Sequence, residues 1–352
     1  MSVLMVGVDE STKGGMWTVV ENYLNSEKFV KENDLVYIPT SITGCNPIKK
    51  VLFTLKAFRR IKKAYKRNKF HILHAHMSER SSITRKRWVM KYAKRQGSKI
   101  VLHMHGAEFE VLYNEMTEKQ KKKVRETLEL ADKILILGEY WSEFVGGLVK
   151  DSSKVQVLYN AVDVPDEYMY SKDSNSILFL GAVSKRKGID ELLQALCETS
   201  KQLKGRYVVN IYGPDVEGNI SEKIAEHGLT EWVRYCGWLN KENKADVLMN
   251  TSINVLPSYN EGLPMTILEA MSYGIPSITT TVAAIPEAVN SNNGILISPG
   301  NVKELGAALL KMALDDEYRF KLSGNSYEDA KKKFSIQTHI LQVQKIYKEL
   351  EQ

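Results

Sequence analysis

Two glutamates stand eight residues apart around a Gly-Leu-Pro sequence in the stretch YNEGLPMTILEA, residues 259–270. We expect Pro264 to begin a helix, because a proline at the first helical position loses no hydrogen bond. The free N–H groups at that helix start favour an anion, best of all a phosphate. Glu269 then lies about 7.5 Å along the helix axis, a spacing that suits the distance from the phosphates of a nucleotide to its ribose. The pattern predicts a nucleotide site, with Glu261 facing a sugar beyond the phosphates, although two acids at a helix start also occur without a ligand.

The elements that would position these residues are short apolar runs alternating with amphipathic stretches. Because apolar strands separated by helices are typical of parallel sheets covered on both faces, the chain is predicted to be α/β. Helical spacing is clearest over 187–203 and 302–313. The predicted strands are 3–8, 35–38, 70–76, 99–105, 133–138, 177–181, 206–213, 232–237, 253–258, 276–280 and 294–297.

The length of 352 residues favours two domains rather than one. The polar stretch NAVDVPDEYMYSKDSNS, residues 160–176, marks the break between the two sets of strands. We therefore expect Rossmann-like domains over 1–165 and 166–335, facing each other across a cleft. The last residues, 336–352, are predicted to form an amphipathic helix that crosses back to the first domain.

The composition indicates a soluble protein of a reducing compartment, since 43% of the residues are hydrophobic and 26% charged. The three cysteines are far apart and form no metal-binding pattern. The N-terminus does not resemble a signal peptide, and no apolar run approaches the ~18 residues of a membrane span. We expect a cytoplasmic protein, peripheral on the inner face of a membrane.

Positive charge is concentrated in the first half of the chain. Residues 1–165 hold 29 Lys and Arg against 18 Asp and Glu, a net of +11, and residues 49–99 hold 18 basic residues and the single acid Glu79. Such a field favours an anionic partner: membrane lipid, a phosphorylated acceptor or nucleic acid. Within KKVLFTLKAFRRIKKAYKRNKF, apolar residues recur at helical spacing and the charged residues are all Lys or Arg. Because a merely solvated helix face usually mixes charges of both signs, contact with an anion or a membrane surface is favoured.

The stretch VLPSYNEGLPMTILEAMSYGIPSITTTVAAIPE, residues 255–287, resembles the donor-site signature of the retaining glycosyltransferases of family 4, which have the GT-B fold. The family pattern contains two glutamates separated by seven residues. Both glutamates fit it here, together with Pro257, Ser258, Gly262, Pro264, Ala270, Gly274 and Pro276.

Other segments extend the resemblance over most of the chain. STKGG (11–15) is similar to the glycine-rich first loop of the family, HMHGAEF (103–109) to its histidine loop, YNAVD (159–163) to its linker entry and GAVSKRKGIDELL (181–193) to its phosphate loop. The sequence departs from the family at Ala182, where many members carry an arginine that can contact a diphosphate. Lys185 or Arg186 could replace it, and the sequence leaves that choice open.

The resemblance implies transfer of a sugar, with retention, from a nucleotide-diphosphate sugar to a saccharide or lipid-linked acceptor in cell-surface polysaccharide synthesis. It implies a UDP- or GDP-linked donor, no metal and no cofactor, and the sequence shows no nucleic-acid-binding motif. The expected catalytic residues are His105, Lys187 and Glu261. The expected donor-binding residues are Gly14, Gly15, Lys185, Arg186, Trp238, Ser258, Gly262, Leu263, Pro264 and Glu269.

Two other functions stay open at the level of sequence. One is a nucleotide-sugar 2-epimerase or hydrolase on the same fold, and the other is a non-catalytic module that binds anionic surfaces through residues 49–99. The histidine pairs 74/76 and 103/105 could suggest zinc, but no cysteine or HExxH sequence completes a ligand set. We therefore expect no metal site there, and we expect His103 to be a packing residue at a sheet end.

Overall fold

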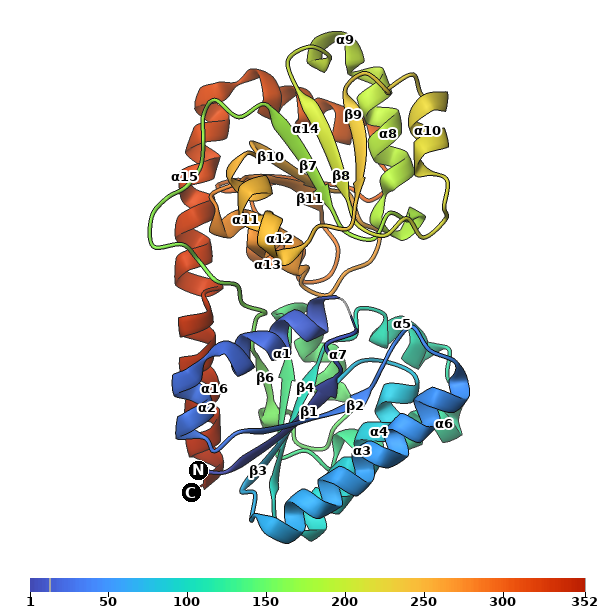
Figure 1. Ribbon diagram of the computed structural model, residues 1–352, viewed down its shortest axis with the longest axis vertical. Helices are drawn as coiled ribbons and strands as arrows, with labels where there is room; N and C mark the ends of the chain where they lie inside the picture. The colour runs from blue at the N-terminus through green and yellow to red at the C-terminus, as the bar shows by residue number, and fades with distance from the viewer. Residues whose placement is uncertain (13, 352) are drawn as a thin grey trace. The chain divides into compact units, whose positions relative to one another are not determined.

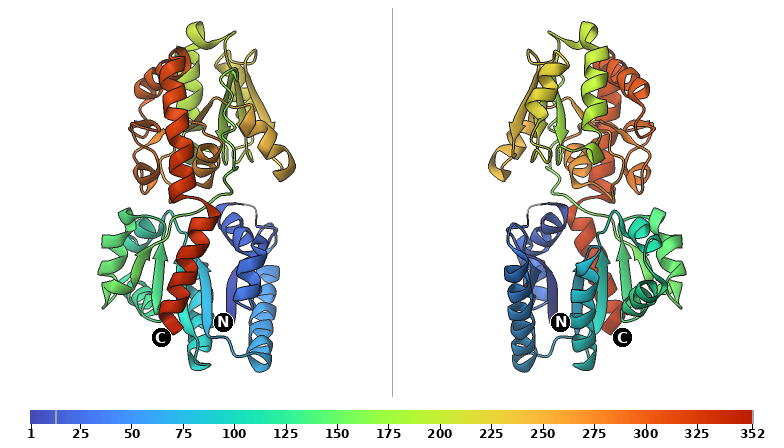
Figure 2. Two further views of the ribbon diagram at one scale, coloured as in Figure 1. Left: turned by 90° about the vertical axis from the view of Figure 1, so that its left-hand side faces the viewer. Right: turned by 90° about the vertical axis from the view of Figure 1, so that its right-hand side faces the viewer.

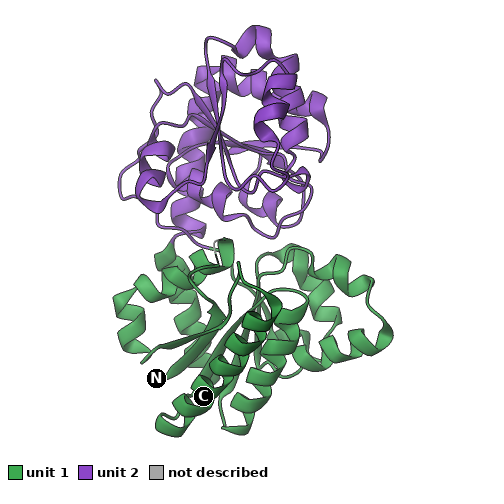
Figure 3. Ribbon diagram, turned by 45° about the vertical axis from the view of Figure 1, so that its right-hand side comes forward, with its two compact units in different colours: residues 1–160, 336–352 green, residues 161–335 purple. Residues whose placement is uncertain are grey.

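The computed structural model describes residues 1–12 and 14–351 (Figure 1). The chain divides into two compact units (Figure 3). Unit 1 comprises Met1–Asn160 with Ile336–Gln352, and unit 2 comprises Ala161–Ser335. Each unit is an α/β domain built on one six-stranded parallel sheet.

The sheet of unit 1 has the order β2-β1-β3-β4-β5-β6. Its strands are apolar and largely buried, as expected where helices cover both faces of a sheet. The strand order reverses between β1 and β3, which makes the carboxyl ends of these strands a topological switch point. The strands are β1 Val3–Val8, β2 Val36–Ser41, β3 Ile72–Met77, β4 Lys99–Met104, β5 Lys133–Ile136 and β6 Val155–Val157.

Helices cover both faces of this sheet (Figures 1 and 2). On one face, α1 and α16 contact the side chain of His74 on β3 through Tyr23 and Tyr347. On the other face, α3 packs on β2 and α4 packs on β3 and β4. The helices are α1 Gly15–Asn25, α2 Glu27–Glu32, α3 Pro47–Arg67, α4 Ser81–Arg95, α5 Phe109–Asn114, α6 Glu118–Leu128, α7 Ser142–Gly147 and α16 Ile336–Glu351.

Local sequence explains where several of these helices begin. Asn46 accepts a hydrogen bond from the Lys49 amide and is followed by Pro47, an N-cap and first-position pair that fixes the start of α3. Thr117 and Gln120 form a capping box at the start of α6. The starts of α3 and α6 therefore follow from short-range chemistry rather than from packing alone.

The sheet of unit 2 has the order β12-β11-β10-β7-β8-β9, which is the strand order of a dinucleotide-binding Rossmann fold. Its switch point lies between β7 and β10. The strands are β7 Ser176–Leu180, β8 Val208–Tyr212, β9 Val233–Gly237, β10 Ile253–Leu256, β11 Ser277–Thr280 and β12 Gly294–Ile297. The helices are α8 Ile189–Glu198, α9 Ser200–Leu203, α10 Ile220–Glu226, α11 Lys241–Met249, α12 Met265–Ser272, α13 Ile285–Ala288, α14 Val302–Leu314 and α15 Asp316–Lys333.

The structure differs from the sequence prediction at the edge strand β6 and at the helix expected over 187–203. The edge strand β6, only three residues long, was not predicted, because Val155–Val157 is too short to give a pattern. The helix expected over 187–203 is two helices, since α8 ends at Glu198, Thr199 caps it, and α9 begins at Ser200. Among the described residues, no helix combines the length and the apolar character needed to cross a membrane.

Candidate active site

Two loops follow the strands that flank the switch point of unit 2. β7 and β10 are neighbours in the sheet, and their carboxyl ends continue into residues 181–188 and 257–264. Most of the predicted donor-binding and catalytic residues of this unit lie in these two loops. Because open α/β sheets bind ligands at such switch points, this is the candidate site of unit 2.

The two loops are joined by an ion pair between Lys187 and Glu261. The Lys187 ammonium contacts Oε1 of Glu261, and the same oxygen accepts a 2.8 Å hydrogen bond from the hydroxyl of Ser258. The two charged side chains are 12% and 7% exposed, so the pair is largely withdrawn from water. The structure thus brings together two of the three predicted catalytic residues, 74 positions apart in the sequence.

A glycine allows this close approach of the loops. Gly188 has φ +73°, and a Cβ atom on it would lie 2.1 Å from the backbone oxygen of Pro257. Left-handed backbone and contact with a backbone atom both disfavour any larger residue. Gly188 is therefore required for the position of Lys187 beside it.

The basic residues of the 3₁₀ turn Lys185–Lys187 have different surroundings. The Arg186 guanidinium donates a 2.8 Å hydrogen bond to the Asn260 carbonyl, and the Arg186 carbonyl accepts one from the Tyr259 amide. The ammonium of Lys185 is exposed and has no partner within residues 1–12 and 14–351. Lys185 is thus the cation of this turn that is not already engaged by protein.

The helix that follows Glu261 begins one residue later than predicted. Pro264 is the N-cap of α12 rather than its first helical residue, since its ψ of 124° is extended. Its carbonyl accepts from the amides of Ile267 and Leu268, and the first amides of the helix have no intrahelical acceptor. The preceding Gly262 and Leu263 are buried, so the whole turn is held within unit 2.

Glu269 and Trp238 lie near other elements of unit 2. Glu269 Oε1 is 2.8 Å from the ammonium of Lys244 on α11, and its side chain is 13% exposed. Sequence reasoning missed Lys244, because nothing in the sequence of α11 distinguishes it from a solvent-exposed lysine. Trp238 follows β9, and its side chain is 46% exposed.

The remaining predicted residues belong to unit 1. Gly14 has φ +139° and caps α1, and Gly15 is the first residue of that helix. His105 directly follows β4, at the carboxyl edge of the sheet, and its amide donates to the Met77 carbonyl. Both segments lie at the end of the sheet where ligands bind in this class of fold.

His105 adjoins a cluster of buried histidines. His74, His76 and His103 are fully buried on β3 and β4, and His339 of α16 joins them. Burial, followed by the nearby His339 and Lys86, lowers the pKa of His105 from 6.5 to about 3. The pKa of His74 is likewise lowered to about 3, mainly by burial, so both imidazoles are neutral at physiological pH.

Three of these histidines are close enough to one another to be considered as metal ligands. One ring nitrogen from each of His74, His76 and His103 lies within 4.8 Å of the others. However, the rings of His74 and His76 are stacked with an interplanar angle of 11°, and His103 is tilted by 28° and 34° to them. Because a histidine binds a metal with an in-plane lone pair, near-parallel rings do not converge on one ion.

Known families match both units of the chain. A model described as Glycosyltransferase Family 4 matches residues 20–165, and a model described as Glycosyl transferases group 1 matches residues 166–329. An uncharacterized 41.2 kDa protein in the cps region of Klebsiella pneumoniae is 26% identical over 322 residues, covering 84% of this chain and 86% of that protein.

A second relative and a solved structure add detail. The O-antigen chain mannosyltransferase B of Escherichia coli is 31% identical over 173 residues, covering 49% of this chain and 45% of that enzyme. The fold matches the crystal structure of HepE from Anabaena in complex with UDP, with a TM-score of 0.77, 14% identity and coverage of 99% and 100%. The chain therefore belongs to the GT-B glycosyltransferases of family 4, and it is a glycosyltransferase.

Proposed function

We propose that the protein transfers a sugar from a UDP- or GDP-linked donor to a saccharide or lipid-linked acceptor with retention of configuration. The observation that carries the proposal is the Lys187–Glu261 pair at the switch point of unit 2, next to the start of α12. Supporting it, the fold resembles that of HepE, whose structure contains UDP. The similarity to the O-antigen chain mannosyltransferase B supports a polysaccharide acceptor.

The geometry suits the stabilisation of a leaving diphosphate. Negative charge grows on the diphosphate as its bond to the anomeric carbon breaks, and Lys187, Lys185 and the first amides of α12 supply positive charge there. Glu261 holds Lys187 in place and offers its other oxygen to a sugar hydroxyl. The acceptor oxygen then bonds to the same face of the anomeric carbon, and its proton passes to the departing phosphate.

The same charges would make a metal ion unnecessary. Metal-dependent transferases use a divalent cation to neutralise the leaving diphosphate, the role that Lys187 and its neighbours take here. His105, on unit 1, is proposed to face the transferred sugar as a neutral hydrogen-bonding group. This assignment rests on its place at the carboxyl edge of β4 and on the family resemblance.

The test is nucleotide release from a panel of UDP- and GDP-sugars, with and without saccharide or lipid-linked acceptors, and NMR assignment of the product anomer. Lys187→Met is expected to lower kcat about 10²- to 10³-fold, as loss of one transition-state contact does. Lys201→Met, at an exposed lysine of α9, is the matched control. An inverted product would refute retention, and equal release without acceptor would indicate a hydrolase.

We further propose that α3 docks the enzyme on an anionic membrane surface. This helix carries nine basic residues and no acidic residue. The structure adds an exposed apolar stripe at its first turns, at the carboxyl edge of the sheet. The exposures are Ile48 71%, Val51 58%, Leu52 59% and Leu55 46%. Apolar side chains flanked by lysine and arginine are typical of helices that lie in a membrane interface.

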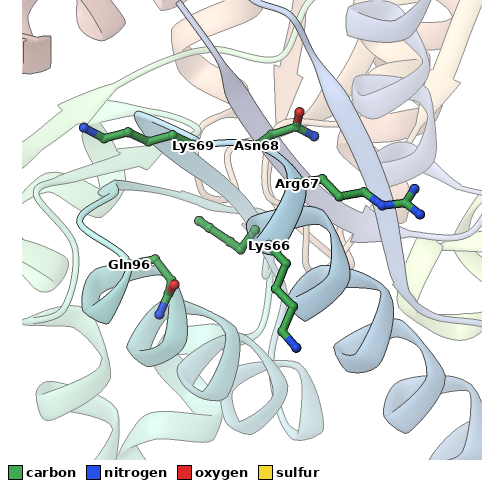
Figure 4. A pocket seen from close by; sticks show the side chains of 6 residues that line it. Lys66, Arg67, Asn68, Lys69 and Gln96 are labelled. Carbon is green, nitrogen blue, oxygen red and sulfur yellow. The ribbon is translucent and has the colours of Figure 1, made fainter.

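The far end of α3 holds a hollow of about 240 Å³. It is lined by Tyr65, Lys66, Arg67, Asn68, Lys69 and Gln96 (Figure 4). The three basic side chains point in different directions, so they do not converge on a single phosphate. This end of the helix is better suited to a diffuse attraction to many lipid headgroups.

Vesicle sedimentation tests the membrane proposal. Phosphatidylglycerol vesicles are expected to bind the protein at low salt and to release it as added salt shortens the Debye length from ~10 Å to ~3 Å. Reversing Lys56, Arg59, Lys63 and Lys66 to glutamate should abolish binding without loss of donor hydrolysis. Reversal of Lys119, Lys122 and Lys123 on α6 is the control. Failure of the wild type to bind would refute the proposal.

A further inference from the structure

A row of side chains leads from His105 into the core of unit 1. Nε2 of His105 lies 2.9 Å from Nδ1 of His76, which stands on β3 directly opposite His103 on β4. His76 is fully buried, whereas His105 is partly exposed. His76 is therefore the inner partner of this pair, and His105 is the member that a ligand can reach.

The hydrogen bond between two neutral imidazoles needs one donor and one acceptor. The second nitrogen of His76, Nε2, is buried and has no hydrogen-bond partner in the described part of the chain. A buried unpaired N–H is rare and costly, and a bare lone pair is better tolerated. The proton of His76 therefore belongs on Nδ1, from which it donates to Nε2 of His105.

The neighbouring histidines have the same arrangement. Nε2 of His103 is also buried without a partner, and its Nδ1 lies 3.4 Å from Nε2 of His74. Nδ1 of His74 in turn lies 2.6 Å from the hydroxyl of Tyr347 on α16. If His74, His76 and His103 each carry their proton on Nδ1, every close contact in the row has one donor and one acceptor. The same assignment leaves the two unpaired nitrogens, Nε2 of His76 and Nε2 of His103, without a proton.

We propose that His76 is a positioning residue that holds His105 as the Nδ1–H tautomer and fixes the plane of its ring. His105 then presents an N–H donor on its exposed side, where Nδ1 has no partner among the described residues. The group that it meets is a sugar oxygen acting as an acceptor. This inference rests on the proposed function, because it assumes that His105 faces the transferred sugar.

The tautomer is measured first, in the free protein, by ¹⁵N NMR of histidine-labelled wild type. The expected spectrum shows His105 protonated at Nδ1 and bare at Nε2, and the opposite pattern overturns the proposal. This readout needs no substrate, so it decides the tautomer even if sugar transfer is not detected. Metal analysis of the same sample is expected to find no stoichiometric ion, since a bound ion would make His76 a ligand instead.

Kinetics of matched variants test the positioning role. His76→Asn keeps an N–H donor near the place of Nδ1 and is expected to retain kcat within a few-fold. His76→Phe removes the donor and is expected to lower kcat about 10- to 100-fold with little change in the donor KM. His74→Phe makes a similar change in the core without touching His105, and its kcat is expected to stay near that of the wild type.

The outcomes separate this proposal from the function itself. If His105→Ala is inactive but His76→Phe keeps the wild-type kcat, the role of His76 is overturned and the proposed function stays intact. If His76→Phe does not fold, the kcat of His76→Asn and the NMR spectrum of the wild type still test whether His76 positions His105. Equal losses in His76→Asn, His76→Phe and His74→Phe would mean that the cluster acts only through stability, which also overturns the proposal.

Discussion

Lowering the pH is expected to unfold unit 1 while unit 2 stays folded. Five of the seven histidines of the chain are packed together in unit 1, and burial lowers the pKa of each of them. The pKa falls from 6.5 to about 3 for His74 and His105, and to about 4 for His339. Between the lowered pKa values and pH 6.5, the unfolded chain therefore binds more protons than the folded chain. The free energy of unfolding of unit 1 consequently decreases as the pH falls below 6.5.

The size of the effect follows from linkage. At pH 5.5, one unit below the unfolded pKa, each such histidine lowers the free energy of unfolding by slightly more than about 1 kcal/mol, and at pH 7 by much less. Five sites then amount to a loss of about 6 kcal/mol between pH 7 and pH 5.5. A domain is commonly stable by about 5–15 kcal/mol in total, so unit 1 should open well above the pH at which carboxylates titrate.

Hydrogen exchange followed by mass spectrometry resolves the two units in one sample. Peptides from β3 and β4 are expected to lose protection between pH 7 and 5.5, after correction for intrinsic exchange. Peptides from unit 2, which contains the single histidine His227, serve as the internal reference. His74→Phe should make the pH dependence shallower by about one site in five. Unchanged protection of β3 and β4 at pH 5.5 would show that the buried histidines do not destabilise unit 1 in acid.

Four further results are expected. Gly188→Ala should destabilise unit 2 by about 3 kcal/mol in urea unfolding, because its Cβ meets the Pro257 carbonyl; a loss below ~1 kcal/mol would mean that the loops separate easily. Burial lowers the pKa of Lys86 from 10.5 to about 7, so Lys86→Met should stabilise unit 1 by up to ~5 kcal/mol at pH 7 and by much less at pH 10; equal gains at both pH values would contradict this. Glu269→Ala should raise the donor KM ~10- to 150-fold without unfolding the protein, and unchanged donor affinity would remove Glu269 from the site. Activity should survive EDTA, whereas a loss reversed only by Mn²⁺ or Mg²⁺ would point to a metal-dependent reaction.

The strands were largely predictable because buried parallel strands are continuous apolar runs. β1 and β12 were predicted at their observed bounds, and most of the others within two or three residues. The edge strand β6 could not be predicted, since three half-buried residues carry no periodic signal. The hydrophobic pattern therefore identifies strands that are buried, and it does not identify a short strand that is only half-buried.

The same limit explains the prediction for α3. Val51, Leu52, Leu55 and Ile61 share a helical spacing, which indicates an apolar face but not what covers it. In the structure Ile61 is fully buried in unit 1, whereas the first three are exposed. Only the tertiary packing separates the residues of the core from those of the surface.

The candidate site was predictable in its residues but not in its contacts. Glycines, prolines and acids at fixed spacing identified the loop around Glu261 through the family resemblance. The pairing of Glu261 with Lys187 depends on which strands are neighbours, and a strand order cannot be deduced from one sequence. The contact of Glu269 with Lys244 is of the same kind, since it joins helices that no local pattern relates.

The place of α16 in unit 1 has a consequence for how the protein is made. The helix is synthesised after unit 2 and after the rest of unit 1, yet its Tyr347 and His339 complete contacts with His74 and Tyr23, more than 270 residues earlier in the chain. Unit 2 is continuous in sequence and can fold as soon as Ser335 has emerged. At a translation rate of about 5–20 residues per second, α16 is made on the order of 10 s after the first 160 residues. During synthesis the histidine face of unit 1 is therefore covered by α1 but not yet by α16. A chain that stops short of residue 336 would leave the α16 side of this face exposed to chaperones or to aggregation.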